Sequence, residues 1–362
     1  MSDPALRRTP LHARHAEAGA KLVPFAGFEM PVVYTSILEE HRSVRSAAGL
    51  FDVSHMGEVR LRGPQAEALA QRLFTNDVAG TPPGGVRYGL LCAEDGGVVD
   101  DVTLYQVAEG ELLFCVNAAT ASADLEWIRS VAARGRYDCQ VIDESDATAL
   151  LAVQGPEARK LVHRLLPDAP RPGRWKFAPT RYQDAEIWLS RTGYTGEDGY
   201  EIFLPNRCAV PLWDALCAAG VRPIGLAARD TLRTEMGYSL YGHELDPSIN
   251  PLEAGLERFV AFGKGFIGEE ALLEIQKRGT PRRIVGLLLE GRQVARPGAP
   301  IVHGGPIGTV TSGTFGPSIE RSIAIGYVPA EHAGVGTRLA IEIRGREIAC
   351  EVAQLPFFHR KR

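Results

Sequence analysis

Two segments of this 362-residue chain repeat one pattern, in which an apolar run is followed by a Gly-Pro pair and then by apolar residues at helical spacing. The segments are residues 60–74 and 151–166. Proline is tolerated in the first turn of a helix because the amide that it lacks has no partner there, so each segment predicts a strand, a tight turn and a helix. Three strand-like runs and another amphipathic stretch follow each segment, within residues 85–135 and 175–220. The repeat predicts an internally duplicated α+β region with antiparallel sheets, whose second unit begins near residue 145; a chance match of common turn sequences is the alternative.

The pattern changes near residue 280. A helix-like stretch over residues 268–279 ends at Gly279, and Pro281 follows as a usual stop signal. Beyond it come short apolar runs separated by glycine and proline, which indicate strands. We therefore predict an α+β region over residues 1–280 and an all-β, barrel-like domain over residues 281–362.

The composition argues against several classes of function. Hydrophobic residues make up 45% and charged residues 23% of the chain, which is typical of a globular protein with an ample core. A formal charge of -4 argues against a dedicated surface for nucleic acid or for an anionic membrane. No apolar run approaches the ~20 residues of a membrane span. The opening segment carries charges where a secretory signal needs apolar residues, so we expect a cytoplasmic protein.

The cysteines stand singly, without a Cys-x-x-Cys pair or a nearby histidine at metal-ligand spacing. We expect them to be free thiols, and we expect no metal site. They are Cys92, Cys115, Cys139, Cys208, Cys217 and Cys350.

One strand-like run, residues 96–107, carries two adjacent acidic residues. Successive side chains of a strand face opposite sides, so Asp100 and Asp101 lie on different faces. Asp101 shares its face with Thr103 and Tyr105, and this polar and aromatic face is expected where a strand lines a cleft. Asp100 is flanked by core-facing valines, which would make it a turn residue or a costly buried charge. Asp101 is therefore the better functional candidate, and a structural role as a turn cap or ion-pair partner is the alternative.

A second stretch, residues 190–204, contains three glycines in seven positions and predicts a loop whose backbone can approach a ligand closely. It lacks the P-loop ending, and Glu197 and Asp198 would repel a phosphate, so its polar groups better suit a ligand that offers hydrogen-bond donors. Glu201 could accept two parallel N–H bonds from a cyclic amidine, and Tyr194 could stack on a flat ring. A surface carboxylate on an edge strand is the alternative interpretation of Glu201.

A third stretch, residues 225–237, crowds charged residues onto one predicted helix that Gly237 would end. Solvated pairs at i,i+3 or i,i+4 spacing, such as Asp230 with Arg233, are the usual explanation of such a pattern. By spacing alone, Arg229 is a weak candidate for ligand binding.

Nine short motifs, in order along nearly the whole chain, resemble those of the glycine cleavage system T-protein family, the tetrahydrofolate-dependent aminomethyltransferases. An ordered series of this kind is far more specific than any one motif. The motifs are FAGFEMP (25–31), LFDVSHMGE (50–58), TNDV (75–78), GGVVDD (96–101), VNAA (116–119), SRTGYTGEDGYEI (190–202), GLAARDTLR (225–233), LYGHEL (240–245) and TSGTF (311–315).

The resemblance implies a three-lobed, folate-binding arrangement with a central channel and a C-terminal β-barrel. It also implies an enzyme of glycine catabolism and one-carbon metabolism. The aminomethyl group on the dihydrolipoyl arm of the H-protein would pass to tetrahydrofolate, giving 5,10-methylenetetrahydrofolate and ammonia. Tetrahydrofolate would be the acceptor substrate, without a metal or a flavin, and the lipoylated H-protein would be the partner.

The resemblance also implies roles for individual residues. Asp101 falls on the key acidic position, in agreement with the strand argument, and its charge would stabilise the iminium-like carbon that forms during transfer. Glu201 would hold the edge of the pterin, and Arg229 would meet polar atoms of the folate. The positions expected to line the folate are Tyr194, Tyr88, Tyr105, Asn117 and, more weakly, Met56.

The sequence departs from the family pattern at the C-terminus, and two alternative functions remain. Some family members carry a folate-contacting tyrosine near the C-terminus, where this chain has Phe357 and Phe358. A folate-dependent demethylase of the same fold would keep the pocket, although an oxidase of this kind normally adds a flavin-binding G-x-G-x-x-G that this chain lacks. A non-catalytic folate-binding protein is the other alternative.

Overall fold

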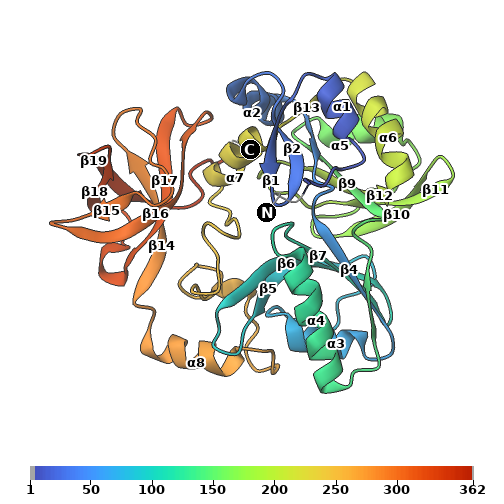
Figure 1. Cartoon of the computed structure of the whole chain (residues 1–362), viewed down its shortest axis with the longest axis horizontal. Coiled ribbons are helices and arrows are strands. Elements are labelled where there is room, and N and C mark those ends of the chain that lie inside the picture. Colours follow the sequence, from blue (N-terminus) through green and yellow to red (C-terminus); the bar gives the residue numbers. More distant parts are fainter. Residues whose placement is uncertain (1–4, 361–362) are drawn as a thin grey trace. The chain divides into compact units, whose positions relative to one another are not determined.

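The computed structural model describes residues 5–360, which form two compact units built from several stretches of the chain (Figure 1). The first unit comprises the chain up to Gln71, Val78–Tyr88 and Val102–Arg229; the second comprises Arg72–Asp77, Gly89–Asp101 and the chain from Asp230.

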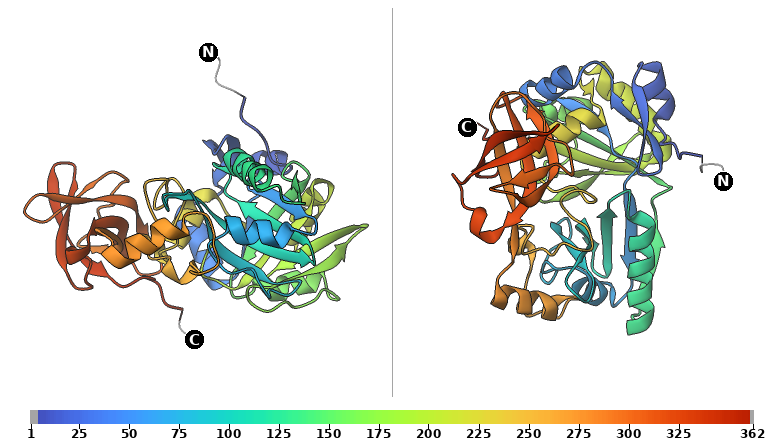
Figure 2. Two further views of the ribbon diagram at one scale, coloured as in Figure 1. Left: turned by 90° about the horizontal axis from the view of Figure 1, so that it is seen from below. Right: turned by 60° about the vertical axis from the view of Figure 1, so that its left-hand side comes forward.

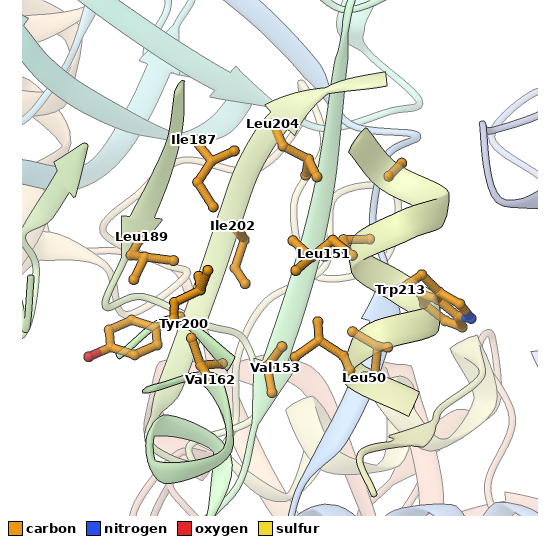
Figure 3. Close-up of a cluster of buried hydrophobic side chains, with 14 of the residues drawn as sticks. Leu50, Leu151, Val153, Val162, Ile187, Leu189, Tyr200, Ile202, Leu204 and Trp213 are labelled. Carbon is orange, nitrogen blue, oxygen red and sulfur yellow. The ribbon is translucent and has the colours of Figure 1, made fainter. Parts of the chain in front are cut away.

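The core of the first unit is a six-stranded sheet in the order β10-β11-β12-β9-β3-β13, antiparallel except for the short edge strand β13. Helices α5 and α6 pack against β9 and β12. The apolar side chains between them, such as Leu151, Ile202 and Trp213, are buried (Figure 3). The elements are β3 (Gly49–Asp52), β9 (Thr148–Gln154), β10 (Phe177–Tyr182), β11 (Ala185–Ser190), β12 (Gly199–Pro205), β13 (Arg222–Pro223), α5 (Ala158–Leu165) and α6 (Asn206–Ala218).

A second sheet has the order β5-β6-β7-β4-β8, and both β5 and β6 continue from one unit into the other. Its elements, with the helices that follow β4 and β7, are β4 (Gly57–Arg62), α3 (Ala66–Leu73), β5 (Val86–Cys92), β6 (Val98–Ala108), β7 (Glu111–Val116), α4 (Ala121–Gly135) and β8 (Gln140–Asp143). The chain before β3 forms α1 (His12–Glu17), the hairpin β1 (Lys21–Phe25) and β2 (Phe28–Val33), and α2 (Ile37–Ser46).

The two sheets confirm the predicted duplication, because each places three successive strands next to the strand of its Gly-Pro segment. The shared order is β5-β6-β7-β4 in one sheet and β10-β11-β12-β9 in the other. Both glycines of the repeated turn have positive φ, +149° at Gly63 and +137° at Gly155. A Cβ at these positions would lie 2.6 Å from the carbonyl oxygen of Asp138 and 2.4 Å from that of Ala47, respectively. Glycine is therefore required twice at the same point of the repeat.

The second unit contains the predicted barrel, which closes in the order β14-β17-β16-β15-β18-β19 and is seen from two further sides in Figure 2. Its interior is apolar, with Leu287, Ile301 and Ile341 fully buried or nearly so. The elements of this unit are α7 (Leu226–Glu235), whose first turn belongs to the first unit, η1 (Glu257–Phe259), α8 (Glu269–Arg278), β14 (Arg282–Leu289), β15 (Pro300–Val302), β16 (Pro306–Gly316), β17 (Arg321–Pro329), η2 (Ala330–His332), β18 (Arg338–Ile343) and β19 (Arg346–Ala353).

No helix within residues 5–360 has the length and apolar character needed to cross a membrane.

Candidate functional site

Glu201 lies in the middle of the six-stranded sheet of the first unit. Its strand, β12, runs between β11 and β9, and Glu201 is paired with Ser190 on one side and Ala152 on the other. The alternative of an edge-strand carboxylate is therefore wrong. The side chain is partly exposed, and the Thr192 hydroxyl donates a hydrogen bond to its Oε2 atom. Burial raises the pKa of Glu201, while that hydrogen bond and the charge of Arg229 act in the opposite direction.

The side-chain amide of Gln154 holds the glycine-rich loop between β11 and β12 through two hydrogen bonds. The Gln154 Nε2 atom donates to the carbonyl oxygen of Thr192 at 3.2 Å, and its Oε1 atom accepts from the Thr195 hydroxyl at 3.1 Å. A Cβ on Gly193 would lie 1.9 Å from Gln154 Oε1, so no side chain fits there without a shift. The loop is thus a fixed support for the residues on either side of it.

The two acidic residues of the loop form ion pairs within the chain. Glu197 accepts from Arg45 at 3.1 Å, and Asp198 accepts from Arg191 at 2.8 Å and from Arg159 at 3.3 Å. Their carboxylates therefore hold the loop in place. The expectation that the polar groups of this loop suit a donor-rich ligand is therefore wrong for Glu197 and Asp198, whose carboxylates pair with arginines of the chain.

Arg229, near the start of α7, faces this loop. Its guanidinium carbon lies 4.7 Å from the centre of the Tyr194 ring, a cation–π contact. Burial lowers the pKa of Arg229, and Tyr194, Glu201 and Cys115 counteract this. An arginine remains charged in proteins, so a partly exposed cation stands beside the partly exposed Glu201 carboxylate.

Tyr105, expected to line the folate, lies behind Glu201. Its side chain is 1% exposed, and its ring packs edge-on against Phe177 and Phe203 at 5.5 and 5.0 Å between ring centres. Its hydroxyl lies near the side chains of Thr192 and Ser190. Burial raises the pKa of this phenol, which stays neutral.

The other predicted residues lie within or next to strands of the second sheet. Met56 stands just before β4, Tyr88 within β5 and Asn117 just after β7, and all three are partly exposed. Asp101 lies within β6 and is partly exposed, whereas Asp100 is fully buried and is not in a turn. The structure thus brings Glu201, Arg229, Tyr194 and Tyr105 together, and places Tyr88, Asp101 and Asn117 on or beside three consecutive strands of the second sheet.

Sequence reasoning missed two buried titratable side chains next to Met56. His55 packs edge-on against Phe25 at 5.5 Å between ring centres, and burial lowers its pKa to about 4, with Arg229 acting in the same direction. Both carboxylate oxygens of Glu58 are buried and accept no hydrogen bond from any residue between 5 and 360. Burial, Asp143 and Glu144 raise the pKa of Glu58 well above its ordinary value. No sequence signal distinguishes Glu58, because alternate polar residues in a strand normally face solvent.

Within residues 5–360 there is no group of three or more His, Cys, Asp or Glu side chains placed to hold a metal ion. The polar groups of the site are instead one carboxylate, one guanidinium and several hydroxyls. Such a set suits an organic ligand that offers N–H donors on one edge and acceptors on another.

Comparisons with known proteins identify the family of the chain. Residues 11–264 match the GCVT N-terminal domain, and residues 282–359 match the glycine cleavage T-protein C-terminal barrel domain. The chain is 45% identical to an aminomethyltransferase of Symbiobacterium thermophilum over 98% of both chains, and 47% identical to one of Rubrobacter xylanophilus over 99% of this chain and 95% of the other. A crystal structure of the glycine cleavage system aminomethyltransferase T from Bartonella henselae matches with a TM-score of 0.93, at 38% identity and over 98% of both chains. The resemblance is therefore confirmed, and the chain belongs to the glycine cleavage T-protein family of aminomethyltransferases.

Proposed function

We propose that this aminomethyltransferase of the glycine cleavage system uses tetrahydrofolate as its acceptor and the lipoylated H-protein as its donor. The observation that carries the proposal is the partly exposed Glu201 carboxylate, fixed by Thr192 and accompanied by Arg229. A pterin presents two parallel N–H groups on its amidine edge and a carbonyl oxygen nearby. A carboxylate accepts the first two and a guanidinium donates to the third.

In the proposed reaction, the bonds from the aminomethyl carbon to nitrogen and to sulfur break, which releases ammonia and the thiol of the dihydrolipoyl arm. The carbon forms new bonds to two folate amines, whose two protons pass to the leaving nitrogen and sulfur. Positive charge develops on that carbon as a leaving group departs, so a fixed anion nearby lowers the barrier. We assign this role to Asp101, which also accepts a hydrogen bond from the attacking amine. Asp101 stabilises charge and positions the amine, and it forms no covalent bond.

Further parts of the proposal concern the remaining residues and the chain as a whole. Tyr194, Tyr88, Asn117 and Met56 line the folate, and Tyr105 supports the site from behind. The division at residue 280 into a folate-binding region and a barrel domain is supported by the limits of the two family matches. Bacterial relatives support a cytoplasmic location.

The test is ammonia release from aminomethylated H-protein, measured with and without tetrahydrofolate. We expect release by the wild type to depend on tetrahydrofolate. Asp101→Asn should keep its unfolding temperature and its folate affinity but lose roughly 100-fold or more in rate, the order found when one charge-stabilising group is removed. Glu109→Gln, which changes an exposed acid in the turn between β6 and β7, is the matched control and should behave as the wild type.

Near-normal turnover by Asp101→Asn would remove Asp101 from the reaction. Folate binding without ammonia release by the wild type would instead favour a demethylase or a non-catalytic folate-binding protein.

A further inference from the structure

A chain of three hydroxyl groups lies behind the Glu201 carboxylate. The Thr192 hydroxyl donates to Glu201 Oε2, and its oxygen lies 2.8 Å from the Ser190 Oγ atom. The Tyr105 hydroxyl lies near both Thr192 and Ser190. Ser190 and Tyr105 are almost completely inaccessible to solvent, with exposed fractions of 0% and 1%.

The fold brings these groups together from different elements. Ser190 ends β11 and is the register partner of Glu201 on β12, while Thr192 follows Ser190 by two residues. Tyr105 comes from β6, where aromatic contacts with Phe177 and Phe203 hold its ring. The fold thus places the Thr192 hydroxyl between the Ser190 hydroxyl and the Glu201 carboxylate.

The number of protons on the Thr192 hydroxyl determines which group donates in each of its hydrogen bonds. A threonine hydroxyl has one proton, and Thr192 donates it to Glu201, so the Thr192 oxygen accepts from the Ser190 hydroxyl. A hydrogen bond donated to a carboxylate favours its ionised form. The hydrogen bond from Thr192 therefore lowers the pKa of Glu201, whereas burial raises it. The bond uses only the Oε2 atom, so the hydroxyls do not occupy the other oxygen of the carboxylate.

We propose that Thr192, supported by Ser190 and Tyr105, is a positioning residue that keeps the Glu201 carboxylate ionised and aimed at the N–H edge of its ligand. The inference rests on the proposed function for the identity of that ligand, a reduced folate. Thr192 itself acts through Glu201. It is therefore assigned to the orientation of the ligand and takes no part in the transfer of the carbon.

The other charged and titratable groups around Glu201 are few. Arg229 on α7 faces it, Tyr194 and Cys115 contact or face Arg229, and Tyr105 lies behind it. Arg229 stays positive and the Tyr105 phenol stays neutral between pH 4 and pH 9. His55, whose pKa is about 4, faces Arg229. Because His55 titrates in the same range, the titration must be read at the Glu201 carboxyl itself.

The experiment follows the Glu201 carboxyl signal by carbon NMR in the full-length protein as pH is varied, assigned by its loss in Glu201→Gln. Thr192→Val removes the hydroxyl and keeps the shape. We expect its Glu201 midpoint to rise by about one pH unit, and its affinity for tetrahydrofolate at neutral pH to fall about tenfold. Thr192→Ser should restore both. Tyr105→Phe should move both in the same direction by less.

Thr309→Val is the matched control, because it removes a threonine hydroxyl at an exposed position on β16. It should leave the midpoint and the affinity unchanged. An unchanged midpoint in Thr192→Val and Tyr105→Phe overturns the inference, as does an equal shift in Thr309→Val. If the midpoint rises as expected but the wild type binds no tetrahydrofolate, the inference about Glu201 is supported and the proposed function is overturned.

Discussion

Arg229 and Arg233 stand four residues apart on one helix, α7, and have opposite surroundings. Arg233 is 1% exposed and donates to Glu244 at 2.7 Å and to the Ser312 hydroxyl at 2.6 Å. Arg229 is partly exposed, stacks on Tyr194, and forms no ion pair with a carboxylate within residues 5–360. The chain satisfies one guanidinium completely and leaves the other available. This difference separates an arginine that holds the fold from one that can bind a ligand.

The neighbours of the two arginines show the same contrast. In the second unit, Glu244 also accepts from the Thr311 hydroxyl at 2.6 Å and from the backbone N–H of Leu240 at 3.0 Å, so both of its oxygens are bonded. In the first unit, Glu58 and the Nδ1 atom of His55 are buried without a hydrogen-bond partner among the described residues. Unsatisfied polar groups reduce stability. His55 and Glu58 stand on either side of Met56 in the sequence, so both of these costly groups belong to one short segment.

The largest expected effect is the loss of stability when Arg233 is replaced. Arg233→Met leaves the Glu244 carboxylate buried without its cation, and breaking a buried pair in this way costs about 3–5 kcal/mol. We expect a loss of this size in the free energy of unfolding by urea. The matched control is Arg346→Met, which changes an exposed arginine at the start of β19 and should change stability little. A loss no larger than that of the control would show that Arg233 and Glu244 contribute nothing as a pair.

The next largest effect is the loss of stability at low pH that the buried His55 causes. Burial lowers the pKa of His55 to about 4, so the folded protein binds fewer protons here than the unfolded chain, whose histidine titrates near 6.5. The stability that neutral His55 provides is complete above pH 6.5 and is lost as pH falls toward 4, a change of roughly 2–3 kcal/mol. Unfolding free energies at pH 7.5 and 4.5 should therefore differ by that much less in His55→Asn than in the wild type. Equal differences in the two proteins would contradict the shift.

The smallest expected effect concerns Glu58, which makes stability fall as pH rises. The pKa of Glu58 is raised, so the folded state holds this proton more tightly, and stability falls as pH rises above the ordinary glutamate value. Glu58→Gln removes that dependence and should be more stable than the wild type at pH 8, by about 1 kcal/mol. Glu67→Gln, at an exposed position on α3, serves as the control. A less stable Glu58→Gln would mean that the carboxylate has a partner when ionised.

The sequence was sufficient for the parts of the fold that depend on local patterns. The two Gly-Pro turns and the apolar periodicities around them identify the duplicated sheets, because turn geometry and burial act on neighbouring residues. The reason that glycine is required at Gly63 and Gly155 is not local, because the backbone oxygens that exclude a Cβ there belong to the distant residues Asp138 and Ala47. The barrel, in contrast, follows from a local pattern, the short apolar runs divided by glycine and proline.

The site was predicted only in part, because its decisive contacts join distant residues. Nothing in the spacing on α7 separates Arg229 from Arg233, since the partner Ser312 of the latter lies 79 residues further along the chain. The sequence alone leaves Glu197 and Asp198 open to a ligand. In the structure, three arginines pair with these carboxylates, namely Arg45, Arg159 and Arg191. Tertiary partners decide which charged group is structural.

The central claim is that Glu201 and Arg229 form one binding site for a reduced folate. It is tested most directly by titrating tetrahydrofolate into the wild type, Glu201→Gln, Arg229→Met and the double variant, with urea unfolding of each. We predict that each single variant binds about 100-fold more weakly, that the double variant binds no more than a few fold more weakly still, and that stability changes little. Unchanged affinity together with a loss of stability like that of Arg233→Met would contradict the claim.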